Sequence, residues 1–316
     1  MSRIFFQPKT LKEALEYRRN YYGAALLAGG TDIVVAIHKN KGPEGDIIDL
    51  SKIKELQEIQ FIGDEIKIRP MVTFTDIADS KILNEKVHIL CQAAMVIGAP
   101  QIRNRGTIGG NICNASPAGD MVPPLVCLEA KVELQSMGAE GDIQTRTIAV
   151  EDFITGNNKT LLERNEILTN IIFKIPLNDV NMSFKKIGRR NALAISRLNG
   201  ACLLKMDNNK ISTINLVIGS ATSKPERFYA VEDYLAGKIL DYEVLSQAGN
   251  LASDYVLKQT GRRSSSAYKL PVIARFTASL IHDILIDVLP PSPTAKDSDL
   301  KRGDASSTII GEGAFL

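Results

Sequence analysis

The stretch that decides the fold reads Leu26-Leu27-Ala28-Gly29-Gly30-Thr31-Asp32-Ile33. An apolar run typical of a strand stops at two adjacent glycines, and a hydroxyl and a carboxylate follow before apolar residues resume. Because glycine has no Cβ, the backbone can take a positive φ there and approach a ligand closely. Consecutive N–H groups in such a turn form a concavity that suits phosphate oxygens. Taken alone, the stretch is equally compatible with a tight turn that binds nothing.

A second stretch of the same kind, later in the chain, reads Thr107-Ile108-Gly109-Gly110-Asn111 and follows directly on Gly106. Each glycine costs a regular element about 1 kcal/mol relative to alanine. We therefore expect neither a helix nor a strand through residues 106–110, but a loop whose backbone lines a ligand. Asp120 lies further on, where its carboxylate could accept hydrogen bonds from ribose or ribityl hydroxyls. A helix N-cap or a surface turn is the alternative interpretation of Asp120.

Two Gly-Gly stretches in one chain predict a ligand with two phosphates that is held from both sides. The chain lacks a GxGxxG segment opening a βαβ unit and lacks GxxxxGK[ST]. A Rossmann dinucleotide site and a P-loop are therefore disfavoured.

Composition narrows the class of protein further. The 316 residues are 44% hydrophobic and 23% charged, with a net charge of +2, so a folded protein without the basic surface of a nucleic-acid binder is expected. No apolar tract approaches the ~20 residues of a membrane span, and the start resembles no secretory signal, which predicts a cytoplasmic protein. The four cysteines and three histidines lack metal-ligand spacing, so we expect buried or semi-buried thiols and no metal site.

Periodicity predicts an α+β chain in four segments: 1–55, 56–176, 177–289, and an extended or disordered tail over 290–316. Residues 1–55 are expected to form a strand, a helix and two short strands. Further strands are expected at 65–69, 130–135, 171–175, 201–206 and 214–218. Helices are expected around 75–83, 86–97, 241–258 and 270–288. The polar run 178–181 marks the boundary before the third segment.

With both glycine stretches in view, residues 3–288 resemble the FAD-binding subunit of the molybdenum hydroxylases, the xanthine dehydrogenase family. The resemblance rests on Ala28 to Asp32 and on Thr107 to Asn111, with Ala115-Ser116-Pro117 and Asp120 behind them. It is supported by residues 165–168, 184–190 and 262–268. It implies a vanillyl-alcohol-oxidase-type (PCMH-type) FAD-binding fold followed by a C-terminal domain of antiparallel sheet and helices.

The resemblance implies a role for each matching position. The backbone of Leu26 to Ile33 would wrap the FAD pyrophosphate, with Thr107, Ile108, Gly109, Gly110 and Asn111 on its other side. Asp120 would bind FAD hydroxyls, Leu168 would line the pocket, and Lys185 would lie near the flavin, although a basic run is more often a solvated face. Ile97 stands where eukaryotic relatives often place an aromatic residue on the ring, so this chain departs from the pattern there. The sequence identifies no catalytic acid or base.

The resemblance also implies partners. A large molybdopterin–molybdenum subunit would hydroxylate the substrate, and a small subunit would carry [2Fe–2S] clusters, in a dimer of heterotrimers. Electrons would reach FAD in this chain and leave to an acceptor such as NAD. The glycine motif favours the xanthine, purine or nicotinate type over the carbon monoxide type, and the lack of a cysteine-rich insertion disfavours the 4-hydroxybenzoyl-CoA reductase branch. A stand-alone flavin oxidoreductase of the same fold and a non-catalytic assembly protein remain open alternatives.

Overall fold

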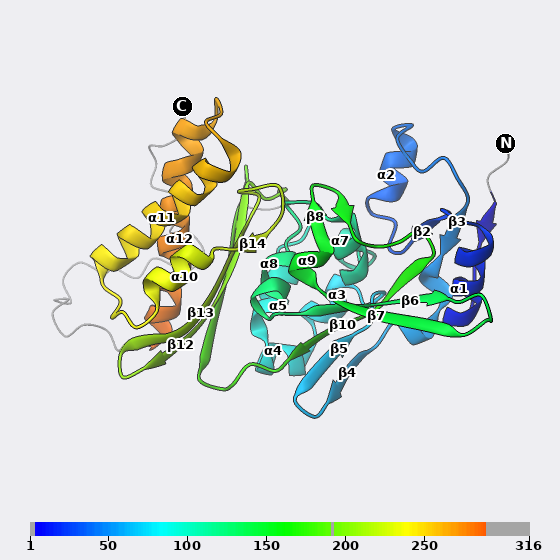
Figure 1. Ribbon diagram of the computed structural model, residues 1–316, viewed down its shortest axis with the longest axis horizontal. Helices are drawn as coiled ribbons and strands as arrows, with labels where there is room; N and C mark the ends of the chain where they lie inside the picture. The colour runs from blue at the N-terminus through cyan, green and yellow to red at the C-terminus, as the bar shows by residue number, and fades with distance from the viewer. Residues whose placement is uncertain (1–3, 191–192, 289–316) are drawn as a thin grey trace.

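The computed structural model describes residues 4–190 and 193–288, which form three larger sheets and one two-stranded sheet with helices around them (Figure 1). The sheets follow one another along the chain and along the long axis of the molecule. The α+β class expected from the sequence is confirmed. The predicted tail, 290–316, lies outside the described residues. The expected division into segments at residues 55, 176 and 289 stays a prediction.

The N-terminal sheet has three parallel strands in the order β1-β3-β2. Its elements are β1 (Phe5–Phe6), α1 (Leu11–Asn20), β2 (Ala25–Leu27), α2 (Ile33–His38) and β3 (Ile47–Asp49). Two 3₁₀ turns, Leu50–Lys52 and Lys54–Leu56, lead out of it. Leu15 of α1 and Ile48 of β3 are fully buried in a small core. The apolar face of α1 therefore packs on this sheet, and this packing holds the helix in place.

The central sheet is antiparallel, with five strands in the order β4-β5-β10-β6-β7. The strands are β4 (Ile59–Ile62), β5 (Glu65–Ile68), β6 (Lys131–Met137), β7 (Ile143–Ala149) and β10 (Glu166–Lys174). Between β5 and β6 run six short helices: α3 (Phe74–Ala78), α4 (Lys81–Lys86), α5 (His88–Met95), α6 (Pro100–Arg103), α7 (Ile108–Asn114) and α8 (Val122–Cys127). α9 (Val150–Phe153) and the hairpin of β8 (Ile154–Gly156) and β9 (Lys159–Thr160) precede β10.

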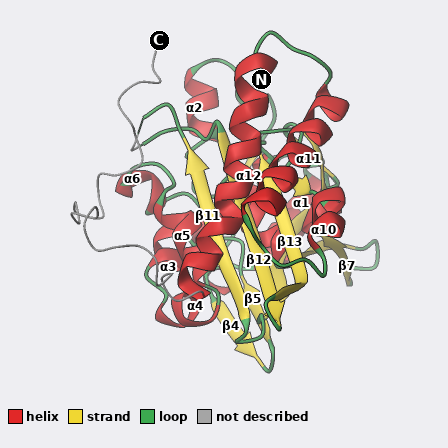
Figure 2. Cartoon of the chain, turned by 90° about the vertical axis from the view of Figure 1, so that its left-hand side faces the viewer, coloured by secondary structure: helices red, strands yellow, loops and turns green. Residues whose placement is uncertain are grey.

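The C-terminal sheet is antiparallel, in the order β11-β12-β13-β14. Its strands are β11 (Val180–Ile187), β12 (Leu198–Asp207), β13 (Lys210–Gly219) and β14 (Glu226–Arg227). Three helices follow: α10 (Tyr229–Leu235), α11 (Tyr242–Thr260) and α12 (Ser266–Val288). Figure 2 shows α11 and α12 lying over one face of this sheet.

Strand alternation explains why β12 is buried along most of its length. Ala201 and Leu203 pack into the core shared with α5 and α8, whereas Cys202 and Leu204 pack into the core under α11 and α12. Successive side chains of a strand point to opposite faces, so both faces of this sheet are covered. The sheet thereby joins the C-terminal half of the chain to the helices that precede β6.

The structure corrects one expectation about local structure. The predicted loop through residues 106–110 is wrong, because α7 begins at Ile108 and contains Gly109 and Gly110. The Thr107 hydroxyl caps the helix by accepting the Gly110 N–H at 3.1 Å. Glycine is needed there for space, since a Cβ on Gly109 would lie 2.5 Å from the Pro70 Cβ. Close packing outweighs the low helix propensity of glycine.

Other helices and strands compare with the sequence as follows. The two long helices expected near the C-terminus are confirmed as α11 and α12. α2, over the apolar run 33–37, was not expected from the sequence. Among the described residues, no helix is long and apolar enough to cross a bilayer.

Candidate cofactor site

The two glycine stretches are in direct contact. We call residues 26–33 glycine loop 1 and residues 107–111 glycine loop 2. A Cβ on Gly29 would overlap the carbonyl oxygen of Arg105 and lie 3.0 Å from the Cα of Gly106. A Cβ on Gly110 would lie 3.8 Å from the Cβ of Ala28. The absence of side chains at these glycines is therefore what lets the two segments meet.

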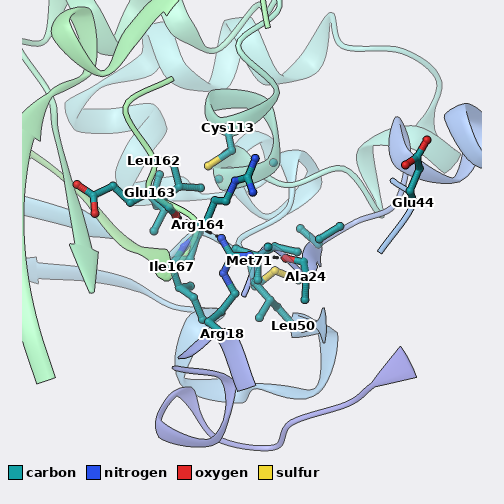
Figure 3. Close-up of a pocket in the computed structure, with 18 residues that line it drawn as sticks. Arg18, Ala24, Glu44, Leu50, Met71, Cys113, Leu162, Glu163, Arg164 and Ile167 are labelled. Carbon is teal, nitrogen blue, oxygen red and sulfur yellow. Dashed lines mark hydrogen bonds between the residues drawn. The ribbon is translucent and has the colours of Figure 1, made fainter. Parts of the chain in front are cut away.

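Two adjoining cavities open beside this contact, of about 660 Å³ and about 650 Å³. The first cavity takes in both glycine loops and extends to Ile97, Asp120, Lys186 and Ile195. The second cavity lies toward β10 and is lined among others by Arg18, Arg164 and Leu168. Four residues line both cavities: Leu26, Ala28, Gly110 and Cys113. Figure 3 shows Arg18, Met71 and Cys113 reaching the second cavity from separate segments of the chain.

Glycine loop 1 supplies free hydrogen-bond donors. Among the described residues, none accepts a hydrogen bond from the backbone N–H groups of Gly29 to Ile33. The next N–H along the chain, that of Val34, donates to the Gly30 oxygen at 3.1 Å. Gly30 has φ +78°, and a left-handed residue within such a turn is the arrangement in which successive N–H groups can form an anion-binding concavity. All five of these residues line the first cavity. Such a run of donors fits phosphate oxygens.

Glycine loop 2 supplies space rather than donors. The Ile108 N–H donates to the Val72 oxygen at 3.0 Å and the Gly109 N–H to the Pro70 oxygen at 2.9 Å. The Gly110 N–H is taken by Thr107. Asn111 differs, because its Oδ1 is buried and has no donor among the described residues, and the residue lines the first cavity. An unsatisfied buried acceptor at a cavity wall fits a ligand that carries hydroxyl groups.

Asp120 forms the polar end of the first cavity. Its carboxylate is buried, with Oδ1 accepting from Ser196 Oγ at 2.5 Å and Asn199 Nδ2 at 2.7 Å, and Oδ2 accepting from Lys186 Nζ at 2.6 Å. Lys186 Nζ also donates to the Val96 oxygen at 3.0 Å. Asp120 is thus neither a helix N-cap nor part of a surface turn.

The structure does not bring Lys185 to either cavity. Its amine donates to the Ser279 carbonyl oxygen at 3.1 Å and lies 2.7 Å from Asp283 Oδ2, both on α12. Lys186, one position later on β11, faces the first cavity instead. Adjacent residues on a strand point to opposite faces, and the sequence alone did not show which face β11 turns to the cofactor side.

The other predicted residues fall into two groups. Side chains or backbone atoms from Leu26, Ala28 to Ile33, Ile97, Thr107, Gly109 to Asn111, Asp120 and Leu168 line one cavity or both. Leu27 and Ile108 do not: Leu27 alternates away from its neighbours along β2, and Ile108 is fully buried in the central core.

Sequence reasoning missed Arg18. Its guanidinium is buried and donates to the carbonyl oxygens of Glu166 at 3.2 Å, Glu163 at 3.3 Å, and Ala24. Burial lowers the pKa of Arg18 to about 10. Arg18 joins α1 to the start of β10 and helps to form the second cavity. A signal was present, because Arg18 follows Ala14 and Leu15 at helical spacing and so shares their buried face.

Among the described residues, neither the cysteine thiols nor the potential metal-ligating side chains form a second site. All four cysteines are free, with Cys113 half-buried at the junction of the cavities and the others buried, as expected from the sequence. Burial raises the pKa of Cys113 to about 12. In the described part of the chain, no three His, Cys, Asp or Glu residues gather as metal ligands would.

Two known family descriptions match this chain over most of its length. A family described as "FAD binding domain in molybdopterin dehydrogenase" matches residues 1–177, and "CO dehydrogenase flavoprotein C-terminal domain" matches residues 182–284. The nicotinate dehydrogenase FAD-subunit of Eubacterium barkeri is 34% identical, covering 89% of this chain and 95% of that protein. The xanthine dehydrogenase FAD-binding subunit of Escherichia coli O157:H7 is 30% identical over 88% of this chain and 94% of that protein.

Solved structures show the same fold. Carbon monoxide dehydrogenase from Hydrogenophaga pseudoflava matches with a TM-score of 0.83 at 24% identity, covering 90% of this chain and 98% of the matched chain. Reconstituted carbon monoxide dehydrogenase from Oligotropha carboxidovorans matches with a TM-score of 0.81 at 25% identity, covering 89% and 97%. The free donors of glycine loop 1, the bare contact between the loops and these matches agree: the chain belongs to the family of FAD-binding subunits of the molybdenum hydroxylases.

Proposed function

We propose that this chain takes electrons from [2Fe–2S] clusters of a small partner subunit and passes them through FAD to an acceptor such as NAD. The hydroxylation itself then takes place at molybdopterin–molybdenum on a large partner subunit, in a cytoplasmic dimer of heterotrimers. The observation that carries the proposal is the run of unpaired N–H groups from Gly29 to Ile33 at a cavity that glycine loop 2 leaves open. FAD supplies the redox chemistry when bound, and the protein binds and orients it.

The two cavities suggest how FAD is placed. The pyrophosphate lies at glycine loop 1, where Gly110 leaves room for it. The flavin ring extends in the first cavity toward Ile97, as the family resemblance implies, and the rest of the cofactor extends into the second cavity, which Leu168 lines. The two cavities share four lining residues, which supports one ligand that spans both.

The relatives support the partners. Their names describe single subunits or medium chains of dehydrogenases, and the chain covers 94–95% of the nicotinate and xanthine dehydrogenase subunits cited above. The substrate class that we propose is a nitrogen heterocycle of the purine or nicotinate kind, on the strength of the same relatives.

The test is purification of the endogenous complex followed by native mass spectrometry and metal analysis. We expect FAD with this chain, molybdenum and iron with two other chains, and a flavin that bleaches when the heterocyclic substrate is added. Reoxidation by NAD, followed as NADH formation, tests the acceptor.

Two other results would count against the proposal. A chain that purifies alone and oxidises a substrate through its own flavin would indicate a stand-alone oxidoreductase. A chain that holds FAD in the complex but stays oxidised while substrate turns over would indicate an assembly role.

A further inference from the structure

The ion pair of Asp120 and Lys186 stands out among the charges of the first cavity. Four charged side chains line that cavity within the described residues: Asp32, Lys41, Asp120 and Lys186. Asp32 and Lys41 are exposed to solvent. The side chains of Lys186 and Asp120, by contrast, are only 12% and 6% exposed. Water therefore screens the first two charges far more than the buried pair.

The pair lies at one particular end of the cavity. Lys186 Nζ donates to the carbonyl oxygen of Val96, the residue directly before Ile97. Ile97 is the position where the ring is placed in the proposed function. Lys186 thus brings a positive charge to the ring end of the cavity, on an amine fixed by two acceptors from different segments.

The carboxylate of Asp120 is occupied by hydrogen bonds from other side chains of the protein. Its two oxygens receive three donors, from Lys186, Ser196 and Asn199, all in the C-terminal half of the chain. Asp120 itself follows α7 and glycine loop 2. A carboxylate so fully used is a poor acceptor for further ligand hydroxyls, but it fixes Lys186 and holds the C-terminal half against the glycine loops.

We propose that Lys186 sets the electrostatic environment of the flavin ring and that Asp120 is its positioning residue. This inference rests on the proposed placement of the ring beside Ile97. The positive charge of Lys186 favours the state in which the ring carries negative charge, as reduced flavin does. Asp120 holds the amine in place and offsets part of its charge, so the two side chains act on the ring with opposite sign.

The opposite signs separate this role from a merely structural one. Lys186→Gln keeps a hydrogen-bond donor toward Asp120 but removes the positive charge, so the negative charge of Asp120 is left uncompensated. Asp120→Asn removes the negative charge of Asp120 and leaves the positive charge of Lys186 in place. A structural role would predict loss of flavin in both variants, whereas an electrostatic role predicts shifts in opposite directions.

The experiment uses the FAD-loaded full-length chain and titrates it with sulfite, which adds to oxidised flavin and leaves negative charge on the ring. For Lys186→Gln we expect the sulfite dissociation constant to rise roughly tenfold, which corresponds to about 1.4 kcal/mol, and the midpoint potential to fall. For Asp120→Asn we expect tighter sulfite binding and a higher potential. Lys185→Gln is the matched control, because Lys185 lies on the same strand, is also ion-paired, and faces α12.

FAD content and thermal unfolding are measured for every variant. FAD-loaded Lys186→Gln protein with wild-type sulfite affinity and potential would overturn the inference, as would an equal shift in the Lys185→Gln control. If Asp120→Asn does not retain FAD, Lys186→Gln and Lys186→Met are compared instead. Both remove the positive charge, so an electrostatic role requires the sulfite dissociation constant and the midpoint potential to shift in the same direction in both variants. A wild-type chain that binds no FAD would overturn the proposed function, which is a separate and recognisable result.

Discussion

Replacement of Gly110 by valine should release FAD and leave the fold intact. Gly110 is helical with no positive φ, so a side chain is not strained by the backbone. A Cβ there would meet Thr107 Oγ1 at 3.0 Å and Ala28 Cβ at 3.8 Å, and would otherwise project toward the cavities that Gly110 lines. The two methyl groups of valine extend further into the space opposite glycine loop 1.

The magnitude follows from the hydrogen bonds at risk. Each charge-assisted bond from a backbone N–H to a phosphate oxygen is worth about 1.5–3 kcal/mol. If valine displaces the diphosphate from one or two of the free donors between Gly29 and Ile33, FAD affinity should fall by about 100-fold or more. Protein stability should change by less than about 1 kcal/mol, because loss of a helical glycine is favourable and offsets the tight contact with Thr107.

The assay is isothermal titration of the flavin-free chain with FAD, alongside urea unfolding of the same protein. Gly156→Val is the matched control, because a Cβ on Gly156 meets nothing within 4 Å and the residue lines neither cavity. Gly30 is a poorer choice, since its φ of +78° makes any substitution strained. Wild-type FAD affinity in a folded Gly110→Val protein would refute the placement of the diphosphate between the loops.

Three further predictions concern the fold that carries the site. Gly29→Ala should lower the free energy of unfolding by about 1–3 kcal/mol even without FAD, because the methyl group overlaps a backbone carbonyl of the neighbouring loop; an unchanged urea midpoint would contradict the contact. Glu232→Ala should cost about 1.5–3 kcal/mol, because it removes the buried acceptor of Arg227 Nη2, 2.7 Å away, and of the Leu216 N–H, and leaves Arg227 paired with the exposed carboxylate of Glu129; urea unfolding measures this, and a loss under 1 kcal/mol would mean that solvent reaches the pair. Burial raises the pKa of Cys91 to about 11 and that of Cys113 to about 12, from an ordinary 9.0, and also raises the pKa of Cys127 and Cys202. The unfolded chain therefore releases these protons first, and stability should fall as pH rises from 9 to 12. Replacing Cys91 and Cys113 by alanine should make that fall less steep, and an unaltered slope would rule out their contribution.

The sequence predicted the elements whose pattern is local. α11 and α12 carry an apolar stripe at helical spacing, and β5, β6 and β12 carry short apolar or alternating runs. Such patterns record which face is buried without reference to what covers it. α7 was missed for the opposite reason, because its two glycines are selected by the backbone of Pro70 and by the proximity of Ala28, which come from other parts of the chain.

The cofactor site, like the fold, was predicted from the sequence only where the pattern is local. The residue types of glycine loops 1 and 2 were sufficient to predict a diphosphate held against bare backbone, since only glycine permits that approach. They could not show that the N–H groups of Ile108 and Gly109 are already occupied by Val72 and Pro70. Whether a backbone donor is free depends on its neighbours in space.

The sequence by itself predicted a cofactor with two phosphates held by two glycine segments, because glycine is the residue type that leaves the backbone bare. Only the tertiary structure decided which loop has free N–H groups, which loop leaves space, and which of two adjacent lysines faces the first cavity. The physical reason is that the two faces of a strand are equivalent in the local sequence until tertiary packing places a particular neighbour against each of them. For β11 the choice was made by α12 on one side and by Asp120 on the other.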